Sequence, residues 1–437
     1  MNWLLKSKFV RAFFFLVAIG FSSNVFGADD TNSLPNVFYA DPFALADAKA
    51  KLAAGDPSLK PALDLLLDEA NRALDAKPRS VMEKNRIPPS GDKHDFVSQA
   101  PYFWRETNAD GVVSYVRHDG ERNPESNVDS DAGRLGATCS NVATLGLAYY
   151  FTGDEKYAAK AAELMRVFFL DPATKMNPNL NFGQGIPGEV DGRPTGLIGA
   201  RGFVDMMDGL ALLKNSSSWP ESDQQQMRAW LEDYLHWLTT SKIGIGEFDA
   251  KNNHGSFYDD QATAIALFLG KTNFAIAIIS EAKTNRIARQ IEANGHEPLE
   301  LARTKSFGYS SFDLRALIDL ASFGQNLGID LWHYRASNGG SIYRAIWFMA
   351  PYADPQKKWP FQQIHGYNHD ALADLLLRAA PQYPQSQLAA ALQFYRPDEI
   401  ISNRCRLQFR TAEIPALRSA SKKSAGNKNS QDEALDE

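Results

Sequence analysis

Cysteine is scarce in this chain, whose only thiols among 437 residues are Cys139 and Cys405. The two residues form no CxxC pair, so the sequence offers no cysteine-based metal site and no dense disulfide framework. They lie far apart, and Cys139 falls in an apolar stretch with helical spacing, so a bridge and a buried free thiol both remain open. Cysteine chemistry therefore gives no guide to function.

The signatures of two large enzyme classes are also missing. There is no GxSxG, the turn that presents the nucleophile of many serine hydrolases, and no GxxxxGKS or GxxxxGKT phosphate loop. Positive charge is not in excess either, since 46 Lys and Arg stand against 52 Asp and Glu, giving a net charge of −6. We therefore expect no nucleic-acid partner, and an anionic substrate would need a local basic site.

The chain begins with a pattern typical of a cleaved secretory signal over residues 1–27. Three cations precede the apolar run AFFFLVAIGF, and they are Lys6, Lys8 and Arg11. The run is too short to span a bilayer comfortably, and the small residues Val25 and Gly27 suit a signal peptidase. We expect a mature chain that starts near Ala28, is periplasmic or secreted, and has no stable membrane insertion. A retained anchor is the alternative.

Alternation of apolar and polar residues with period two is rare, and GVVSYVRHDG at 111–120 is the best candidate for a short hairpin strand. Apolar residues instead recur at helical spacing along most of the chain. The segments with this spacing are 41–56, 59–74, 134–153, 154–170, 203–214, 224–240, 262–283, 314–328, 342–353, 371–380 and 387–395. The sequence therefore predicts an all-α protein.

Two long polar stretches, 77–131 and 171–199, interrupt this helical pattern and are rich in Gly, Pro and Asn. Loops of this length inside a compact helical domain usually bind something. Helices joined alternately by short and long connections suit an α/α toroid, an incomplete α/α barrel of antiparallel helix pairs whose long loops form a cleft. We predict one such domain over residues 28–417. A disordered tail is predicted at 418–437, which lacks aromatic residues and apolar periodicity.

The stretch KNNHGSFYDDQ at 251–261 places two amides and an imidazole before an apolar run. Asn252 or Asn253 could cap a helix that begins near Gly255, because a side-chain oxygen can accept an unpaired N–H of the first turn. His254 could be an ordinary surface histidine. Alternatively, the stretch could contact a substrate, with Asn252 as one of the binding residues.

A second stretch, LARTKSFGYSSFDLRAL at 301–317, supplies an arginine and a tyrosine. In an unbroken helix, Arg303 and Tyr309 would lie on different faces, but Gly308 permits a bend that brings both toward one cleft. Taken singly, Tyr309 could be a packing residue and Arg303 a surface cation. The two stretches together suggest a more specific interpretation.

Asparagine, histidine, arginine and tyrosine side chains together suit β-elimination from a uronic acid. The C5 proton is poorly acidic, because its removal adds negative charge beside a carboxylate. Asn253 and Arg303 could bind the carboxylate and stabilise the enolate-like intermediate, and a cation beside Tyr309 would lower the pKa of its phenol. Tyr309 could then take the C5 proton and return a proton to the O4 leaving group. His254 could assist at the carboxylate or act as base from the opposite face.

These stretches resemble the alginate lyase superfamily, which includes polysaccharide lyase families 5 and 38. NNHGSFYD and RTKSFGYS carry the resemblance, which extends in ordered blocks from about residue 85 to 365. The other blocks are SGDKHDFVSQAPYFW, YVRHDGERNPE, MNPNLNFGQGIPGEVDGR, GGSIYRAIWFMAPYA and WPFQQI. The resemblance implies an α/α toroid and lyase activity on alginate-like or glucuronan-like polymers. It assigns the asparagine, histidine, arginine and tyrosine roles to Asn253, His254, Arg303 and Tyr309.

The preferred sugar is less well defined, because Gly255-Ser256-Phe257 stands where family 5 enzymes have a bulky aromatic motif. In mannuronate and glucuronate the C5 hydrogen and O4 lie on the same face, so Tyr309 could be both base and acid. In guluronate they lie on opposite faces, and His254 would have to be the base. We expect cleavage of β-1,4-linked polyuronate to 4,5-unsaturated ends, with poly-mannuronate favoured and glucuronan as the alternative.

Other candidates for substrate binding lie mostly upstream of these stretches. The rings of Tyr102, Phe103 and Trp104 could stack on sugars, or could anchor a loop on the core. Four polar residues could pair with hydroxyls and carboxylates, namely His94, Gln99, Arg117 and Gln184. Trp359 is as ambiguous as the upstream rings.

A metal site is one competing interpretation. His365 and His369 are four apart, which on a helix could hold a metal, but Gly366 stands where a zincin has glutamate. We therefore expect no metal and no cofactor.

Glycoside hydrolysis is another alternative, because α/α toroids also host hydrolases. Acid pairs such as Glu189 with Asp191, or Asp259 with Asp260, could serve it, although such pairs are common in any sequence. A non-catalytic periplasmic glycan-binding protein is the third alternative to a lyase. The sequence leaves the oligomeric state open.

Overall fold

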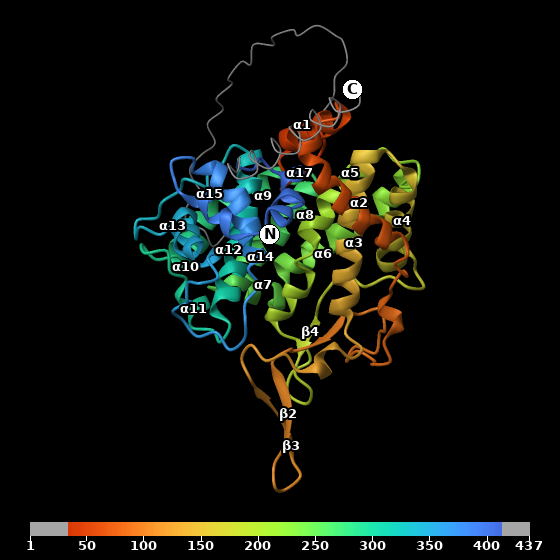
Figure 1. Ribbon diagram of the computed structural model, residues 1–437. Coiled ribbons are helices and arrows are strands. Elements are labelled where there is room, and N and C mark those ends of the chain that lie inside the picture. The colour runs from red at the N-terminus through yellow and green to blue at the C-terminus, as the bar shows by residue number, and fades with distance from the viewer. Residues whose placement is uncertain (1–33, 413–437) are drawn as a thin grey trace, which may run out of the picture. The chain divides into compact units, whose positions relative to one another are not determined.

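The structure is a computed structural model that describes residues 34–412 (Figure 1). The signal predicted at 1–27 and the tail predicted at 418–437 lie outside the described residues. The contacts divide the chain into Met1–Leu34 and Pro35–Glu437, and the architecture below is that of the second unit.

Helices dominate this unit, as the sequence predicted. The longer ones are α1 Pro42–Ala53, α2 Lys60–Leu74, α3 Asp131–Thr152, α4 Glu155–Met165, α5 Phe203–Leu212, α6 Glu221–Thr240, α7 Lys242–Phe248, α8 Asn253–Phe268, α9 Thr272–Ala282, α12 Ser306–Asn326, α13 Ile342–Met349 and α14 Asp370–Ala379. Short helical segments are α10 Ala288–Gln290, α11 Pro298–Leu301, α15 Leu388–Ala391, α16 Pro397–Ile401 and α17 Cys405–Gln408. The prediction of a single helical run over 262–283 was wrong, because the chain turns at Gly270, where φ is +74°, between α8 and α9.

The helices form an all-α toroid that is not closed into a barrel. Helices α3, α5, α8, α12 and α14 contact one another in that order and form its inner layer. Helices α4, α9 and α13 pack against α3, α8 and α12, respectively, and contribute to the outer layer. The predicted fold is therefore confirmed. Helices α8 and α12 are neighbours in this ring, and both begin earlier than their apolar periodicity indicated.

Helices α3 and α5 approach closely because each presents a glycine at the crossing. A Cβ on Gly146 would lie 2.3 Å from the Gly209 carbonyl oxygen, and a Cβ on Gly209 would lie 2.7 Å from the Cα of Ala143. Both distances are shorter than van der Waals contact, so larger residues would push the helices apart. The inner layer is therefore tightly packed on this side.

The long polar stretches contain the strands of the described residues. Strand β1 (Val97–Gln99) pairs in parallel with β4 (Phe182–Gly185). Strands β2 (Phe103–Thr107) and β3 (Val113–Arg117) form an antiparallel hairpin, which projects at the bottom of Figure 1 with Phe103 opposite Arg117. The predicted hairpin strand at 111–120 is therefore confirmed, and its partner was missed because it shows no clear alternation.

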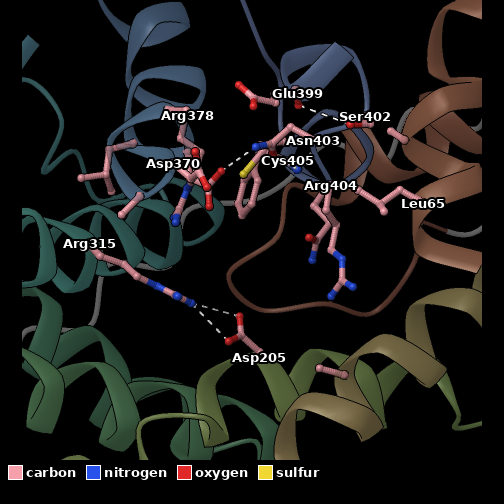
Figure 2. Close-up of a pocket in the computed structure, with 18 of the residues that line it drawn as sticks. Leu65, Asp205, Arg315, Asp370, Arg378, Glu399, Ser402, Asn403, Arg404 and Cys405 are labelled. Atoms are coloured by element: carbon pink, nitrogen blue, oxygen red, sulfur yellow. Dashed lines mark hydrogen bonds and ion pairs between the residues drawn. The ribbon is translucent and has the colours of Figure 1, made fainter. Parts of the chain in front are cut away.

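A cavity of about 920 Å³ lies along the face of α12 that runs from Gly308 to Arg315, and Lys305, just before the helix, also lines it. Figure 2 shows Arg315 reaching across it toward Asp205 on α5, at 3.2 Å. Asn403 likewise donates to Asp374 at 2.6 Å. Arg315 and Asp374 of this cavity are thus already engaged by other residues in its lining, and none of the four predicted catalytic side chains lines it.

Both cysteines are free, Cys139 in the core and Cys405 partly covered. Within the described residues, no helix combines the length and the apolar composition needed to cross a bilayer.

Candidate active site

Helix α8 begins at Asn253, with Asn252 as its N-cap residue. The Asn252 side chain makes no capping hydrogen bond, which corrects the expectation that one of the two amides would cap the helix itself. The carboxylate of Glu300 accepts the Asn253 backbone N–H instead, at 2.8 Å. Asn253 Nδ2 also lies 2.8 and 2.9 Å from the two oxygens of Glu300. The buried Asn253 side chain is therefore held in one orientation.

His254 is fixed by a carboxylate on the preceding helix. Its Nδ1 lies 2.7 Å from Oε1 of Glu247 on α7. Burial raises the pKa of Glu247, although the neighbouring His254 and Arg286 oppose this shift. Among the described residues Nε2 of His254 has no hydrogen-bond partner, so it remains available to a ligand.

Arg303 lies in the turn between α11 and α12, where Asp119 from the loop after β3 holds its guanidinium. Nε lies 3.0 Å from each Asp119 oxygen, and Nη2 lies 2.6 Å from Oδ1. Burial alone would raise the pKa of Asp119, but Arg303 and the Thr304 N–H lower it to about 2. Nη1 of Arg303 has no hydrogen bond to any described residue, so this end of the guanidinium is open.

Tyr309 lies in the first turn of α12 and contacts Arg303 directly. Arg303 Nη2 donates to the Tyr309 hydroxyl at 2.7 Å, and the guanidinium carbon lies 3.7 Å from the centre of the ring. The bend that permits this contact is in the turn 302–305, whereas Gly308 is inside α12, so the predicted position of the bend was wrong.

The Tyr309 hydroxyl donates to the Tyr102 hydroxyl at 2.7 Å. Burial raises the pKa of Tyr309 above its usual range, the hydrogen bond to Tyr102 adds to this, and Arg303 opposes it. Without a ligand the phenol is therefore neutral.

The two stretches of the sequence meet at the ends of neighbouring helices. Phe257 on α8 and Phe312 on α12 are in contact, with 4.2 Å between ring centres. His254 and Tyr309 each lie three residues before one of these rings, one turn nearer the helix start. A carboxylate or sugar ring placed there would face an imidazole, a guanidinium and a phenol, which is an arrangement suited to proton transfer beside an anion.

The alginate lyase family model matches residues 80–359, which is more than half of the chain. The chain belongs to the alginate lyase family. A solved alginate lyase from Bacteroides ovatus shares 40% of its sequence with this chain, at a TM-score of 0.81, covering 86% of this chain and 99% of that one.

Two more distant structures share the fold. Alginate lyase A1-III from Sphingomonas species A1 is 17% identical with a TM-score of 0.52, covering 86% of this chain and 96% of that chain. A variant of A1-III complexed with a tetrasaccharide is 16% identical with a TM-score of 0.55, covering 87% and 98%. No curated protein matches the chain.

In this alginate lyase family member, two further binding candidates lie beside the Arg303–Tyr309 pair. Tyr102 reaches it through its hydroxyl, a hydrogen bond that the expected stacking role did not include. Arg117 donates to Asp119 at 2.6 Å, so it shares the carboxylate that holds Arg303.

Trp104 and the predicted polar residues make their contacts elsewhere. Trp104 Nε1 donates to the Glu121 carbonyl at 3.0 Å. His94 Nδ1 lies 2.6 Å from the Lys175 carbonyl oxygen. No direct hydrogen bond joins either residue to the four predicted catalytic side chains.

Gln99 and Gln184 lie on the paired strands β1 and β4. Gln99 is buried and lies 3.4 Å from Arg86, and its Nε2 has no partner among the described residues. Gln184 has φ of +48°, and its side-chain oxygen accepts from Arg193 at 3.2 Å.

The prediction of a binding role for Trp359 is corrected by its burial. This ring is only 5% exposed and packs against the aromatic rings of Phe307 and Tyr352. Its Nε1 donates to the hydroxyl of Ser306 at 2.7 Å. Trp359 therefore supports the start of α12 from the core side.

The structure also places the segment after His254 in the interior. A Cβ on Gly255 would lie 2.3 Å from the Ala250 carbonyl oxygen and 2.5 Å from Nη1 of Arg286. The hydroxyl of Ser256 donates to Gln290 at 2.9 Å. These residues are packed against the protein, and the hydrolase pair at Asp259 is likewise committed, because that carboxylate bonds Arg286 at 2.8 Å.

Sequence reasoning missed the three carboxylates that hold the site, namely Asp119, Glu247 and Glu300. Asp119 lies in the quoted block YVRHDGERNPE, but nothing in the sequence links it to Arg303, 184 positions away. Glu300 precedes Arg303 by three residues, which by itself indicates only a helical ion pair. In each case only the three-dimensional structure shows which residue the carboxylate contacts.

Proposed function

We propose that this chain is a polysaccharide lyase that cleaves β-1,4-linked polyuronate by β-elimination, with poly-mannuronate as its preferred substrate. The observation that carries the proposal is the Arg303–Tyr309 pair, in which a guanidinium donates to a phenol at 2.7 Å and keeps Nη1 open. Because the first 27 residues have the pattern of a secretory signal, we place the enzyme in the periplasm or outside the cell.

The substrate carboxylate would be bound by donors that the protein itself leaves free. Arg303 offers Nη1, and Nε2 of His254 can donate only when both nitrogens of the imidazole are protonated, because Nδ1 faces Glu247. Asn253 Nδ2 donates to both oxygens of the Glu300 carboxylate. Because these two oxygens lie on the same side of Nδ2, one N–H can point at both, and the second N–H is left for the substrate. These donors would stabilise the charge that develops when the C5 proton leaves.

Tyr309 would transfer the proton in both directions. In its phenolate form, stabilised by Arg303, it takes the proton from C5 as the C5–H bond breaks. The C4=C5 double bond forms as the C4–O4 bond breaks, and the neutral phenol returns the proton to O4. The phenolate is thereby regenerated, and the new chain end is an unsaturated uronate.

The preference for mannuronate follows from stereochemistry. One residue can serve as both base and acid only where C5–H and O4 share a face, as they do in mannuronate and glucuronate. His254 is held by Glu247 at 2.7 Å and would be the base for guluronate. Glucuronan therefore remains the second substrate to test.

The decisive experiment follows the ultraviolet absorbance of the new double bond on purified poly-mannuronate, poly-guluronate and glucuronan. We expect absorbance to rise fastest on poly-mannuronate. Reducing ends that appear without absorbance would identify a hydrolase and overturn the proposal. If the parent chain binds these polymers and yields no product, it is a glycan-binding protein.

A further inference from the structure

Glu300 connects the two halves of the site. Its carboxylate accepts the backbone N–H and the side-chain Nδ2 of Asn253, at distances of 2.8 to 2.9 Å. The backbone carbonyl oxygen of Glu300 accepts the backbone N–H of Arg303 at 3.0 Å. One residue thus fixes the start of α8 relative to the turn that carries Arg303.

This carboxylate replaces the missing cap of α8. The first N–H groups of a helix have no partner within it, and a negative charge near them is favoured by the helix dipole. Since Asn252 makes no side-chain capping bond, Glu300 takes over that role from a separate segment. Glu300 therefore connects the start of α8 with the turn at 302–305 that carries Arg303.

Glu300 is an unusual choice for a purely structural position. It is 1% exposed, and it forms no ion pair with any residue from 34 to 412. Burying a carboxylate that has no ion-pair partner costs free energy, and the buried acids Glu297 and Asp313 raise that cost, whereas the charges of Arg303 and His254 reduce it. Burial raises the pKa of Glu300, and the hydrogen bonds from Asn253 oppose the shift. An apolar side chain would avoid this cost only by leaving the backbone N–H and Nδ2 of Asn253 without an acceptor.

We propose that Glu300 is a positioning residue for the lyase reaction. By holding the Asn253 amide against the segment of Arg303, it makes the free N–H of Asn253 and Nη1 of Arg303 converge on one uronate carboxylate. This inference rests on the proposed function and adds a residue that has no contact with the reacting atoms.

The test compares Glu300→Gln with Glu297→Gln. Glu297 is a buried acid in the same segment, and it makes no hydrogen bond to Asn253 or Arg303, so it is a matched control. We expect Glu300→Gln to lower kcat on poly-mannuronate by about tenfold to a hundredfold, because a small misplacement of a catalytic group is costly. KM should change much less, and the control should retain its kcat.

A double-mutant cycle then shows whether Glu300 acts through Asn253. In an Asn253→Ala background, Glu300→Gln should have little further effect on kcat. Additive effects, or equal kcat in Glu300→Gln and Glu297→Gln, would overturn the inference while the parent chain stays active. A parent without lyase activity would overturn the proposed function as well. If Glu300→Gln does not fold, Glu300→Asp keeps the charge and should show the same loss of kcat with KM little changed.

A separate hollow lies at the other end of α12. Its volume is about 510 Å³, and it is lined by Tyr334, Arg335, Tyr343, Arg344 and Tyr383 among others. The rings of Tyr343 and Tyr383 lie 4.8 Å apart. Neither guanidinium has an ion pair or a side-chain hydrogen bond within the described part of the chain. The neighbouring acid, Asp330, is paired with His333 at 2.9 Å.

This hollow is remote from the catalytic pair. Gln382 in its wall donates to Gln325 in the last turn of α12 at 3.1 Å, whereas Tyr309 is in the first turn. Sixteen helical residues separate Gln325 from Tyr309, which corresponds to about 24 Å. A polymer of several sugars would be needed to bridge that distance.

We infer that the hollow binds a second stretch of polyuronate. Tyrosine rings stack on pyranose faces, and the open guanidiniums of Arg335 and Arg344 pair with carboxylates. On a chain whose net charge is −6, two cations without partners in one hollow are a local attraction for an anionic polymer. This second inference also rests on the proposed substrate class.

The test uses the double variant Arg335→Ala with Arg344→Ala, and Arg72→Ala on α2 as an exposed-arginine control. We expect the double variant to raise KM for long poly-mannuronate by about threefold or more and to leave trisaccharide turnover unchanged, because each exposed charged contact contributes only modestly to binding. A KM equal to that of the control would overturn the inference. Loss of trisaccharide turnover would also contradict it, because it would indicate an effect on the active site.

Discussion

Two arginine–aspartate pairs lie near the starts of α8 and α12, and they differ in what their guanidiniums leave open. Arg286 bonds Asp259 through Nε and Nη2, at 2.8 and 2.9 Å, and donates to the carbonyl oxygens of Ala250 and Phe248. It is 2% exposed. Arg303 bonds Asp119 in the same two-point manner, but its side chain is 16% exposed and Nη1 is open.

The difference indicates what distinguishes a structural pair from a catalytic one. Every nitrogen of Arg286 is used by the protein, so this arginine can only hold the chain in place. Arg303 uses one nitrogen on the phenol of Tyr309 and keeps another for a ligand. Substitutions should therefore separate stability from turnover.

The largest effect on stability is expected for Arg286→Ala. Removing one partner of a buried ion pair leaves Asp259 uncompensated and should lower the free energy of unfolding by about 3–5 kcal/mol. Urea denaturation measures this loss. A variant as stable as the parent would show that the pair is not structural.

Arg303→Ala should show the opposite behaviour. Loss of the guanidinium should reduce kcat by about a hundredfold to a thousandfold, because a donor to the developing charge is gone. The thermal midpoint should fall by only a few degrees, since the pair with Asp119 is partly exposed. Near-full activity would contradict the role assigned to this residue.

Gly255→Ala, like Arg286→Ala, should lower the free energy of unfolding. The added methyl group would meet the Ala250 carbonyl oxygen and the Arg286 guanidinium, and the resulting strain should cost about 1–3 kcal/mol. The ratio of rates on poly-mannuronate and poly-guluronate, measured by absorbance, should stay unchanged. A shifted ratio would instead place Gly255 at the sugar.

The pH dependence of kcat/KM tests Tyr309, the phenol that Arg303 contacts, as the base. Burial raises the pKa of Tyr309, so below that pKa the reactive phenolate increases about tenfold per pH unit. The rate should therefore rise toward alkaline pH. Asp119, whose pKa is about 2, stays ionised throughout and does not contribute to this rise. A rate independent of pH from neutral to alkaline values would exclude Tyr309 as the base.

Periodicity was sufficient for the helices but not for their ends. Polar residues at the starts of α8 and α12 carry no apolar signal, so the α12 run was predicted to start late, and the start of α8 near Gly255 came from its capping residues instead of from periodicity. Those first turns hold the site, because helix ends face the cleft where function requires polar side chains. The motif resemblance identified Asn253, His254, Arg303 and Tyr309 as candidates, and the fold brings their segments to one end of the toroid.

The residues that hold these four could not be found in the same way. Asp119 reaches Arg303 from the loop after β3, and Glu247 reaches His254 from α7. Trp359 and Tyr102 are both aromatic residues in quoted blocks, yet one is in the core and the other bonds Tyr309. Residue type gave no basis for separating them.

The sequence by itself determined the helical class, the chemistry available and the two stretches that carry it. These follow from local periodicity and residue type, which are properties of neighbouring positions. Only the tertiary structure decided which arginine keeps a nitrogen open and which acid caps α8. Those choices depend on contacts between segments distant in the chain, since a hydrogen bond saturates a donor only when the fold brings its acceptor within about 3 Å.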